Sequence, residues 1–174
     1  MQARHPFGAD DVERIVVRGS KATVEHVGWK YRPEGVTSSQ LNLAYCVATW
    51  LIEGACFVDQ FSAALVADPA RMALAERVEC LEDPAISGEG PDMRHKVHVE
   101  VRLKDGTVMT ETVEKALGSE AHFGSDDAIR DKFRLLATNV LSATQADRLA
   151  DAVMHLEDLP DAAEVARLLV PQPV

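Results

Sequence analysis

Hydrophobic and polar positions alternate most regularly between residues 96 and 104. The apolar members of this run are Val97, Val99, Val101 and Leu103. Such alternation predicts a strand with one buried face. Asp105 and Gly106 follow at once, and this pair favours a two-residue type I′ turn, so Thr107–Val113 is predicted to return as the second strand of a hairpin. In that register Glu100 faces Glu111, a mildly unfavourable pair of like charges.

Other apolar runs predict shorter elements on both sides of a long helix. Strands are expected at Val12–Arg18 and Val78–Leu81, and helices at Lys21–Val27, Val58–Val66 and Asp68–Arg77, whereas Gly28–Gly35 and Asp83–Pro91 are expected to be loops. Thr37 and Gln40 form a capping-box pattern, so the long helix is predicted to begin there and to end at Gly54. Because this helix is apolar nearly all round, both of its sides are expected to be buried.

Polar cap residues predict three helices near the C-terminus. Ser125 is expected to cap a helix that ends at about Leu141, Ser142 and Gln145 form a second capping box, and a short helix should follow Asp161. A loop is expected at 118–124. The mixed order of elements predicts an α+β fold, in which a small antiparallel sheet with packed helices is followed by C-terminal helices.

Composition excludes several classes of protein. The chain has 174 residues and a formal net charge of −10, and its Lys and Arg residues form no cluster, so no nucleic-acid partner is expected. No apolar run reaches the roughly 18 residues of a membrane span, which predicts a cytoplasmic protein without a membrane partner. Cys46, Cys56 and Cys80 lie in apolar runs without a C-x-x-C pair, so they are expected to be reduced, buried thiols.

Sequence motifs for nucleotide binding, acyl transfer and zinc proteolysis are absent. His95 and His98 are three residues apart, a spacing that places them on opposite faces of a strand, and no metal site is predicted. Between Tyr31 and Gln40 the sequence brings a guanidinium, hydroxyls and an amide to a helix start, where free backbone amides favour a carboxylate. The alternative is a capped helix whose Arg32 makes a local surface contact.

The candidate substrate-binding residues are Arg32, Ser39, Gln40, Asn42 and His122. His122 lies in a glycine-flanked loop, where its ring can donate or accept a proton, and an ordinary exposed loop histidine is the alternative. The acidic pairs Asp126-Asp127 and Glu157-Asp158 are explained by helix capping and by solvation. No catalytic residue is assigned from the residues alone.

Six strings, in this order, make the chain similar to the C-terminal part of the MmgE/PrpD family of 2-methylcitrate dehydratases, cis-aconitate decarboxylases and iminodisuccinate epimerases. They are DDVERIVVR, YRPEGVTSSQLNLAYCVATWLIEG, FSAALVADPARMALAERVE, VEVRLKDGTVMTETV, DKFRLLATNVL and LEDLPD. The resemblance implies a lid-like α+β domain at 1–124 and a helical segment at 125–174 that packs on a separate helical domain. It also implies a di- or tricarboxylate substrate and proton chemistry without a cofactor.

In the family, the acid and base come from the helical domain and from a K-x-Y-P-x-C-x-x-x-H type segment before the first strand, and neither is expected in this chain. The long helix also departs from the family's F-S-x-x-Y pattern, since Leu41, Asn42 and Tyr45 stand there. A lid alone can shape and desolvate a site but cannot transfer a proton. We therefore expect a lyase or isomerase part that needs a helical partner chain. The alternatives are a non-catalytic binding or oligomerisation module and a truncated product.

Overall fold

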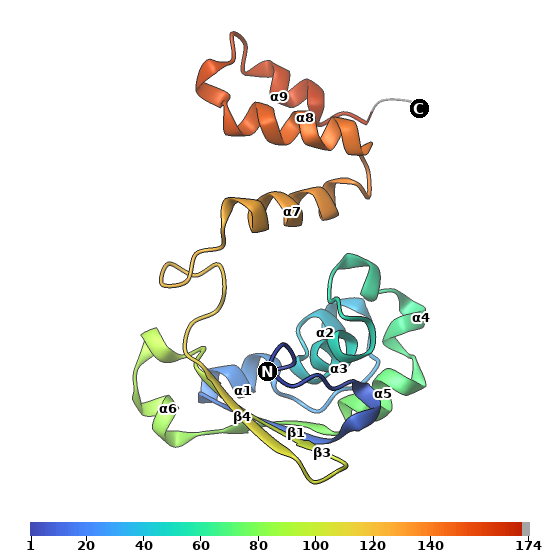
Figure 1. Ribbon diagram of the computed structural model, residues 1–174, viewed down its shortest axis with the longest axis vertical. Helices are drawn as coiled ribbons and strands as arrows, with labels where there is room; N and C mark the ends of the chain where they lie inside the picture. The colour runs from blue at the N-terminus through green and yellow to red at the C-terminus, as the bar shows by residue number, and fades with distance from the viewer. Residues whose placement is uncertain (172–174) are drawn as a thin grey trace. The chain divides into compact units, whose positions relative to one another are not determined.

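The computed structural model describes residues 1–171 and divides the chain into two units (Figure 1). Unit 1 is Met1–Ala116, and unit 2 is Leu117–Val174. Unit 1 holds a four-stranded sheet with helices, and unit 2 is helical, so the predicted α+β class is confirmed. Over residues 1–171, no helix is long and apolar enough to cross a membrane.

The sheet of unit 1 has the strand order β2-β1-β3-β4. Its strands are β1 (Val12–Gly19), β2 (Val78–Glu82), β3 (Val97–Leu103) and β4 (Val108–Val113). The β1–β3 and β3–β4 pairs are antiparallel, as predicted. The predicted sheet was antiparallel throughout, and the β1–β2 pair departs from this because it is parallel. A parallel pair needs a long crossover connection, and the helices between β1 and β2 provide it.

The hairpin of β3 and β4 forms with a different register from the predicted one. Glu100 lies opposite Thr110, so the expected pair of Glu100 with Glu111 is wrong. The loop holds three residues, Lys104–Gly106, instead of two, and its glycine takes a φ of +90° that other residues rarely adopt. The added loop residue shifts the register by one and so separates the two carboxylates.

Apart from α1, which has the predicted bounds, the helices predicted in unit 1 are shorter in the structure. The helices of this unit are α1 (Lys21–Val27), α2 (Val36–Gln40), α3 (Leu43–Glu53), α4 (Ala63–Val66), α5 (Pro69–Ala75) and α6 (Pro84–Gly88), with 3-10 turns at Ala9–Asp11, Val58–Gln60 and Pro91–Met93. Asp68 caps α5 at the predicted helix start, and Ser20, which was not predicted as a cap, caps α1. Val58–Val66 is not one helix, because Ser62 caps α4 separately. Asp83 caps α6 inside the predicted loop.

The single long helix predicted from Thr37 to Gly54 is wrong, since the chain forms α2 and α3 with a break between them. Thr37 lies inside α2, whose N-cap is Gly35 at a φ of +124°. Asn42 causes the break: it takes an extended conformation, and its side-chain oxygen accepts the backbone N–H of Tyr45 at 2.9 Å. An asparagine N-cap begins a new helix in this way. Gly54 ends α3 at a φ of +69°, as predicted.

One face of the sheet packs against α3 and α5, and the other faces away from these helices (Figure 1). The core of unit 1 contains Val12, Ile15, Val17, Ala44, Ala48, Leu74, Ala75, Val78, Val101 and Met109. Arg14, Arg18 and Arg102 alternate with the buried strand residues and are exposed. The observed alternation is that of a strand with one solvated face.

Unit 2 consists of α7 (Asp126–Ala137), α8 (Ala143–Met154), a 3-10 turn (Leu156–Asp158) and α9 (Ala163–Leu168). Ser125 and Ser142 cap α7 and α8 as predicted, although α7 ends before Leu141. The second capping box is only half formed. Ser142 accepts the Gln145 amide at 3.2 Å, but the Gln145 side chain donates to the carbonyls of Leu168 and Val170 at 2.8 and 2.6 Å.

Candidate functional site

A groove of about 620 Å³ lies in unit 1 between the inner face of the sheet and α3. Val97, Val99 and Val101 form part of its sheet wall, and Leu43, Val47 and Leu51 form part of its helix wall. Met1 and Phe7 of the N-terminal segment line it as well. Pockets of this size lined mainly by apolar side chains are typical binding sites, so we treat this groove as the candidate site.

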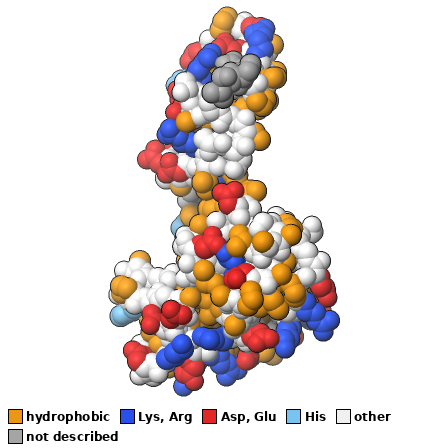
Figure 2. Space-filling model, turned by 90° about the vertical axis from the view of Figure 1, so that its right-hand side faces the viewer, with side chains coloured by type: hydrophobic (Ala, Val, Ile, Leu, Met, Phe, Trp, Pro, Cys, Tyr) orange, Lys and Arg blue, Asp and Glu red, His pale blue; other side chains and the backbone are white. Residues whose placement is uncertain are grey.

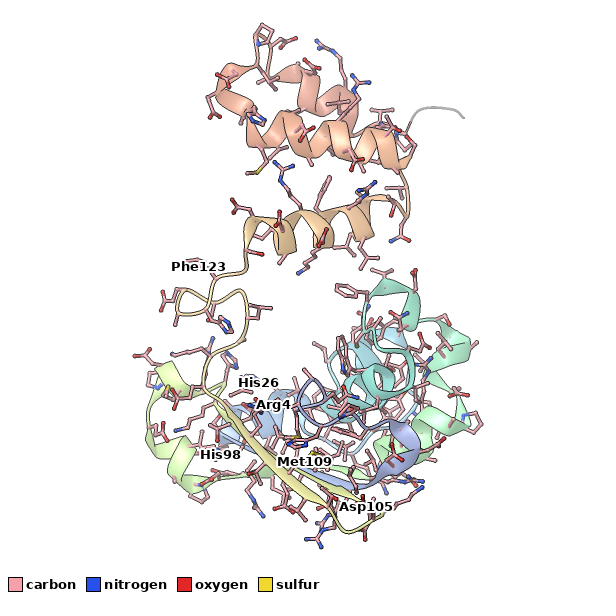
Figure 3. All side chains as sticks on the ribbon, viewed as in Figure 1. Arg4, His26, His98, Asp105, Met109 and Phe123 are labelled. Atoms are coloured by element: carbon pink, nitrogen blue, oxygen red, sulfur yellow. The ribbon has the colours of Figure 1, made fainter. Side chains whose placement is uncertain are left out.

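The N-terminal segment is fixed to the groove by three polar contacts. The Met1 ammonium lies 2.8 Å from one carboxylate oxygen of Glu111, and the Arg4 guanidinium lies 2.9 Å from the other. The indole N–H of Trp50 donates to the side-chain oxygen of Gln2 at 3.0 Å. In Figure 3, Arg4 is labelled on the N-terminal segment and Met109 on β4, the strand that also carries Glu111.

Glu111 lies among apolar residues of the groove wall, yet it is held in its ionised form. A hydrogen bond from the N-terminal ammonium, with the charge of Arg4, lowers the pKa of Glu111 below its usual value. An ionised carboxylate accepts hydrogen bonds and donates none. Glu111 therefore suits the anchoring of positive groups and does not suit the role of a general acid near neutral pH.

Cys46 is a neutral thiol in the wall of the groove. Burial, together with the neighbouring Cys56, raises the pKa of Cys46 to about 12. Its sulfur lies 3.8 Å from the carbonyl oxygens of Ser39 and Gln40. A thiol with so high a pKa is a poor nucleophile. Cys46, Cys56 and Cys80 are free, as predicted, but they are half-buried where full burial was expected.

The structure places two of the predicted site residues, Gln40 and Asn42, at the groove. Asn42 is fully buried. Its side-chain amide donates to the carbonyl of Trp29 at 2.7 Å while its oxygen caps α3. Gln40 ends α2 and is exposed at the groove. Asn42 thus fixes the start of α3, and Gln40 presents an exposed amide beside the apolar walls.

The other three predicted residues are not brought to the groove. Arg32 is exposed and lies 4.0 Å from Glu34. The Ser39 hydroxyl is buried and donates to the Gly35 carbonyl at 2.9 Å. Gly35 begins a helix of only five residues, which offers little of the dipole expected at this position. His122 is exposed in the loop of unit 2.

Sequence reasoning missed a buried polar cluster between α3 and α5. Arg71 is 2% exposed and forms an ion pair with Glu53, and two of its side-chain nitrogens, Nε and Nη1, have no hydrogen-bond partner within residues 1–171. The hydroxyl of Tyr45 donates to the Gln60 carbonyl at 2.7 Å, and burial raises the pKa of Tyr45. Arg71 precedes the buried Leu74 by three residues, a spacing that could have predicted its burial.

The geometry of unit 1 suits the binding of apolar groups better than proton transfer. The groove walls are apolar, its carboxylate is neutralised by two positive groups, and its thiol stays protonated. Within the described part of the chain, no three His, Cys, Asp or Glu side chains gather so that they could hold a metal ion. An apolar surface of this kind can exclude water from a site that other groups complete.

Comparison with known proteins agrees with the sequence strings. Residues 1–158 match the MmgE/PrpD C-terminal domain. The chain is 29% identical to a cis-aconitate decarboxylase-like protein of Aspergillus oryzae, over 97% of this chain and 36% of that protein. It is 30% identical to the cis-aconitate decarboxylase of Mus musculus over 94% of this chain and 32% of the mouse protein. The chain therefore spans about a third of the length of these relatives.

A mitochondrial 2-methylcitrate dehydratase of Yarrowia lipolytica is also similar to part of the chain. It is 33% identical over 59% of this chain and 20% of its own length. The relatives thus include a dehydratase as well as decarboxylases, and all three match through a minor part of their sequences. The common feature of the matches is one domain, and the chemistry named for the relatives differs.

Proposed function

Because this chain belongs to the MmgE/PrpD family through its C-terminal domain, we propose that it is the lid part of a lyase or isomerase of di- or tricarboxylates. The named activities of the relatives, decarboxylation of cis-aconitate and dehydration of 2-methylcitrate, supply the substrate class. We propose that a helical partner chain contributes the acid and base, and that this chain closes over the substrate. The cytoplasmic location expected from the sequence stays a prediction.

Exposed apolar side chains on both units support the need for a partner. In unit 1, Leu41 is 54% exposed and Trp50 is 49% exposed, although both belong to the wall of the groove. Figure 2 shows hydrophobic side chains gathered over the helices of unit 1. In unit 2, Ile129 is 60% exposed. Large apolar patches on a protein surface usually mark interaction sites.

The exposure of apolar side chains on α3 at the rim of the groove is the observation that carries this proposal. α3 was expected to be buried on both sides, but Trp50, which lines the groove, and Ile52 remain exposed. A partner packed there would bury these side chains and place Gln40 beside the closed site. We propose Gln40 as the substrate contact of this chain and Asn42 as the residue that positions it. Arg32, Ser39 and His122 stay predictions.

The experiment compares this chain alone with a mixture that contains a helical chain bearing the K-x-Y-P-x-C-x-x-x-H segment from the same genome. We expect no turnover of cis-aconitate or 2-methylcitrate by the isolated chain and turnover after mixing, because proton transfer needs groups from both. Trp50→Glu should abolish the gain by placing a charge in the interface. Glu13→Gln, on the exposed surface of β1, is the matched control.

Two results contradict the proposal. Turnover by the isolated chain shows that the partner is not needed. A stable homo-oligomer that neither binds the helical chain nor gains activity with it favours the non-catalytic module. Circular dichroism of the Trp50→Glu variant separates loss of the interface from loss of the fold.

A further inference from the structure

Unit 1 has a second, smaller pocket that shares Val27 with the groove, and we name it the Arg94 pocket. Its volume is about 230 Å³, and it is lined by Ala22, Thr23, His26, Val27, Arg94 and His95. The first four residues belong to α1, and the last two follow the 3-10 turn Pro91–Met93. Figure 3 labels His26 on α1. The pocket therefore joins a helix to a loop about seventy positions later in the chain.

Two hydroxyl groups fix the loop to α1 through the backbone carbonyl of Arg94, whose side chain carries the guanidinium of the pocket. Ser20, which is 4% exposed, donates from its hydroxyl to the carbonyl of Arg94 at 2.5 Å. Thr23 donates to the same carbonyl at 2.8 Å. Both hydrogen bonds use the backbone of Arg94 and leave its side chain unaffected. Since preorganised groups bind ligands at a lower entropic cost, this anchoring favours a binding site.

The side chains of Arg94 and His95 are arranged so that nitrogen donors remain for a ligand. Nε of Arg94 lies 2.9 Å from Nε2 of His95, which makes Nε2 the acceptor and assigns the proton of the neutral ring to Nδ1. Arg94 makes no ion pair with residues 1–171. Its terminal edge of Nη1 and Nη2 is therefore the fork that pairs with a carboxylate through two parallel hydrogen bonds.

The charge balance of the pocket points to a negative ligand. No carboxylate lines it, although the whole chain carries a net charge of −10. Of the acidic residues nearby in sequence, Glu25 lies 3.7 Å from Lys21 and Glu89 lies 2.8 Å from Lys96, and the exposed Asp92 does not line the pocket. No acid in the lining therefore neutralises the positive charge of Arg94. Two imidazole rings add hydrogen-bond donors beside it.

We propose that the Arg94 pocket binds a small carboxylate, with Arg94 as the charged partner and His26 and His95 as additional hydrogen-bond donors. The planar guanidinium favours a planar carboxylate with two oxygens in its plane. The pocket volume is below the range of drug-sized ligands, which limits the occupant to a few carbon atoms. This inference depends on unit 1 alone and holds whether or not the proposed function is correct.

The test uses the full chain and succinate as the probe. Titration at constant ionic strength, followed by NMR of the histidine ring signals, should shift the signals of His26 and His95 and leave those of His122 unchanged. Arg94→Gln should weaken succinate binding about tenfold or more, because it removes a charge-assisted pair of hydrogen bonds. Arg102→Gln is the matched control, since it removes an exposed arginine from the outer face of the sheet. It should leave the affinity within about twofold.

Four outcomes overturn the inference. Equal weakening by Arg94→Gln and Arg102→Gln shows attraction by overall charge and no defined site. Equal shifts of the His26 and His95 ring signals with sodium chloride at the same ionic strength also show that there is no defined site. Tighter binding of inorganic phosphate than of succinate contradicts the assigned carboxylate class. His26→Gln, which should weaken succinate binding by a smaller factor than Arg94→Gln, confirms the pocket if the affinity falls and contradicts it if the affinity stays the same.

Discussion

The two units differ in how completely each buries its own apolar residues. The core of unit 1 contains ten buried residues from the sheet, α3 and α5, whereas that of unit 2 contains Leu141, Ala146, Leu149, Ala152 and Leu168. No residue of α7 is buried, although the helix is strongly amphipathic. Small domains with little core are marginally stable on their own. Unit 1 therefore has the core of an independent folding unit. In unit 2, Phe133 and Ala137 of α7 pack on a smaller core, and Ile129 of the same helix stays exposed.

Leu74→Ala should have the largest effect and separates the two cores. Leu74 is 4% exposed in α5, and its loss leaves a cavity, so the free energy of unfolding of unit 1 should fall by about 2–5 kcal/mol. Leu149→Ala is the matched change in unit 2, where Leu149 is 3% exposed. Native-state hydrogen exchange should show loss of protection in β1 and β3 for Leu74→Ala alone. Loss of protection in both units with either variant would show one cooperative core.

Local signals explain most of what the sequence predicted correctly. Asp68, Ser125 and Ser142 cap helices, as predicted, through bonds to amides three residues ahead. Alternation in the sequence likewise predicted β3, because the side chains of a strand point in turn to its two faces. Each of these features depends on residues close together in the chain.

Two of the errors arose where a distant partner decides the structure. Asn42 breaks the long helix with the help of the Trp29 carbonyl, and this contact spans thirteen residues. Gln145 leaves its capping box to bind carbonyls more than twenty residues away. The candidate site shows the same limit. Gln40 was chosen for its place at a helix start, but only the fold could reveal the apolar walls beside it.

Packing density at glycine positions sharpens the comparison between the units. A β-carbon at Gly28 in unit 1 would lie 2.8 Å from the sulfur of Cys80 and 2.9 Å from the backbone of Val24. At Gly124 in unit 2 the nearest atom would be 3.9 Å away. Gly28→Ala should therefore lower the free energy of unfolding by about 1–3 kcal/mol through overpacking. Gly124→Ala should be neutral within about 0.5 kcal/mol in urea denaturation. Equal losses would mean that both sites are equally crowded.

Ile129→Lys tests whether the apolar face of α7 is uncovered in the chain by itself. Ile129 is 60% exposed, so the charge should change the free energy of unfolding of unit 2 by less than about 0.5 kcal/mol. Binding of a helical partner should be lost, as a binding assay with the two purified chains would show. Asn139→Lys adds the same charge at an exposed polar position just after α7 and should keep that binding. A loss of stability above 1 kcal/mol would show that the face is packed internally.

The smallest effect concerns two carboxylates, one in each unit, whose pKa values are lowered by different kinds of contact. The pKa of Glu111 is lowered first by the N-terminal ammonium and then by Arg4, and both groups come from the other end of unit 1 in the sequence. The pKa of Asp161 is lowered first by a hydrogen bond from Arg167, six residues later, and then by one from the Ala163 amide. A carboxyl with a lowered folded pKa stabilises the fold above its unfolded pKa, and this stabilisation is lost as the pH falls through the folded value.

Both contributions should therefore be present at neutral pH and should disappear below about pH 4, where the carboxyls become protonated. NMR titration of the carboxyl carbons should show that Arg4→Gln raises the pKa of Glu111 and leaves that of Asp161 unchanged. Arg167→Gln should do the reverse. In 1 M salt the pKa values should return toward their ordinary values, because these exposed pairs are screened. A pKa of Glu111 that does not respond to Arg4→Gln would mean that the ammonium alone lowers the pKa of this carboxyl.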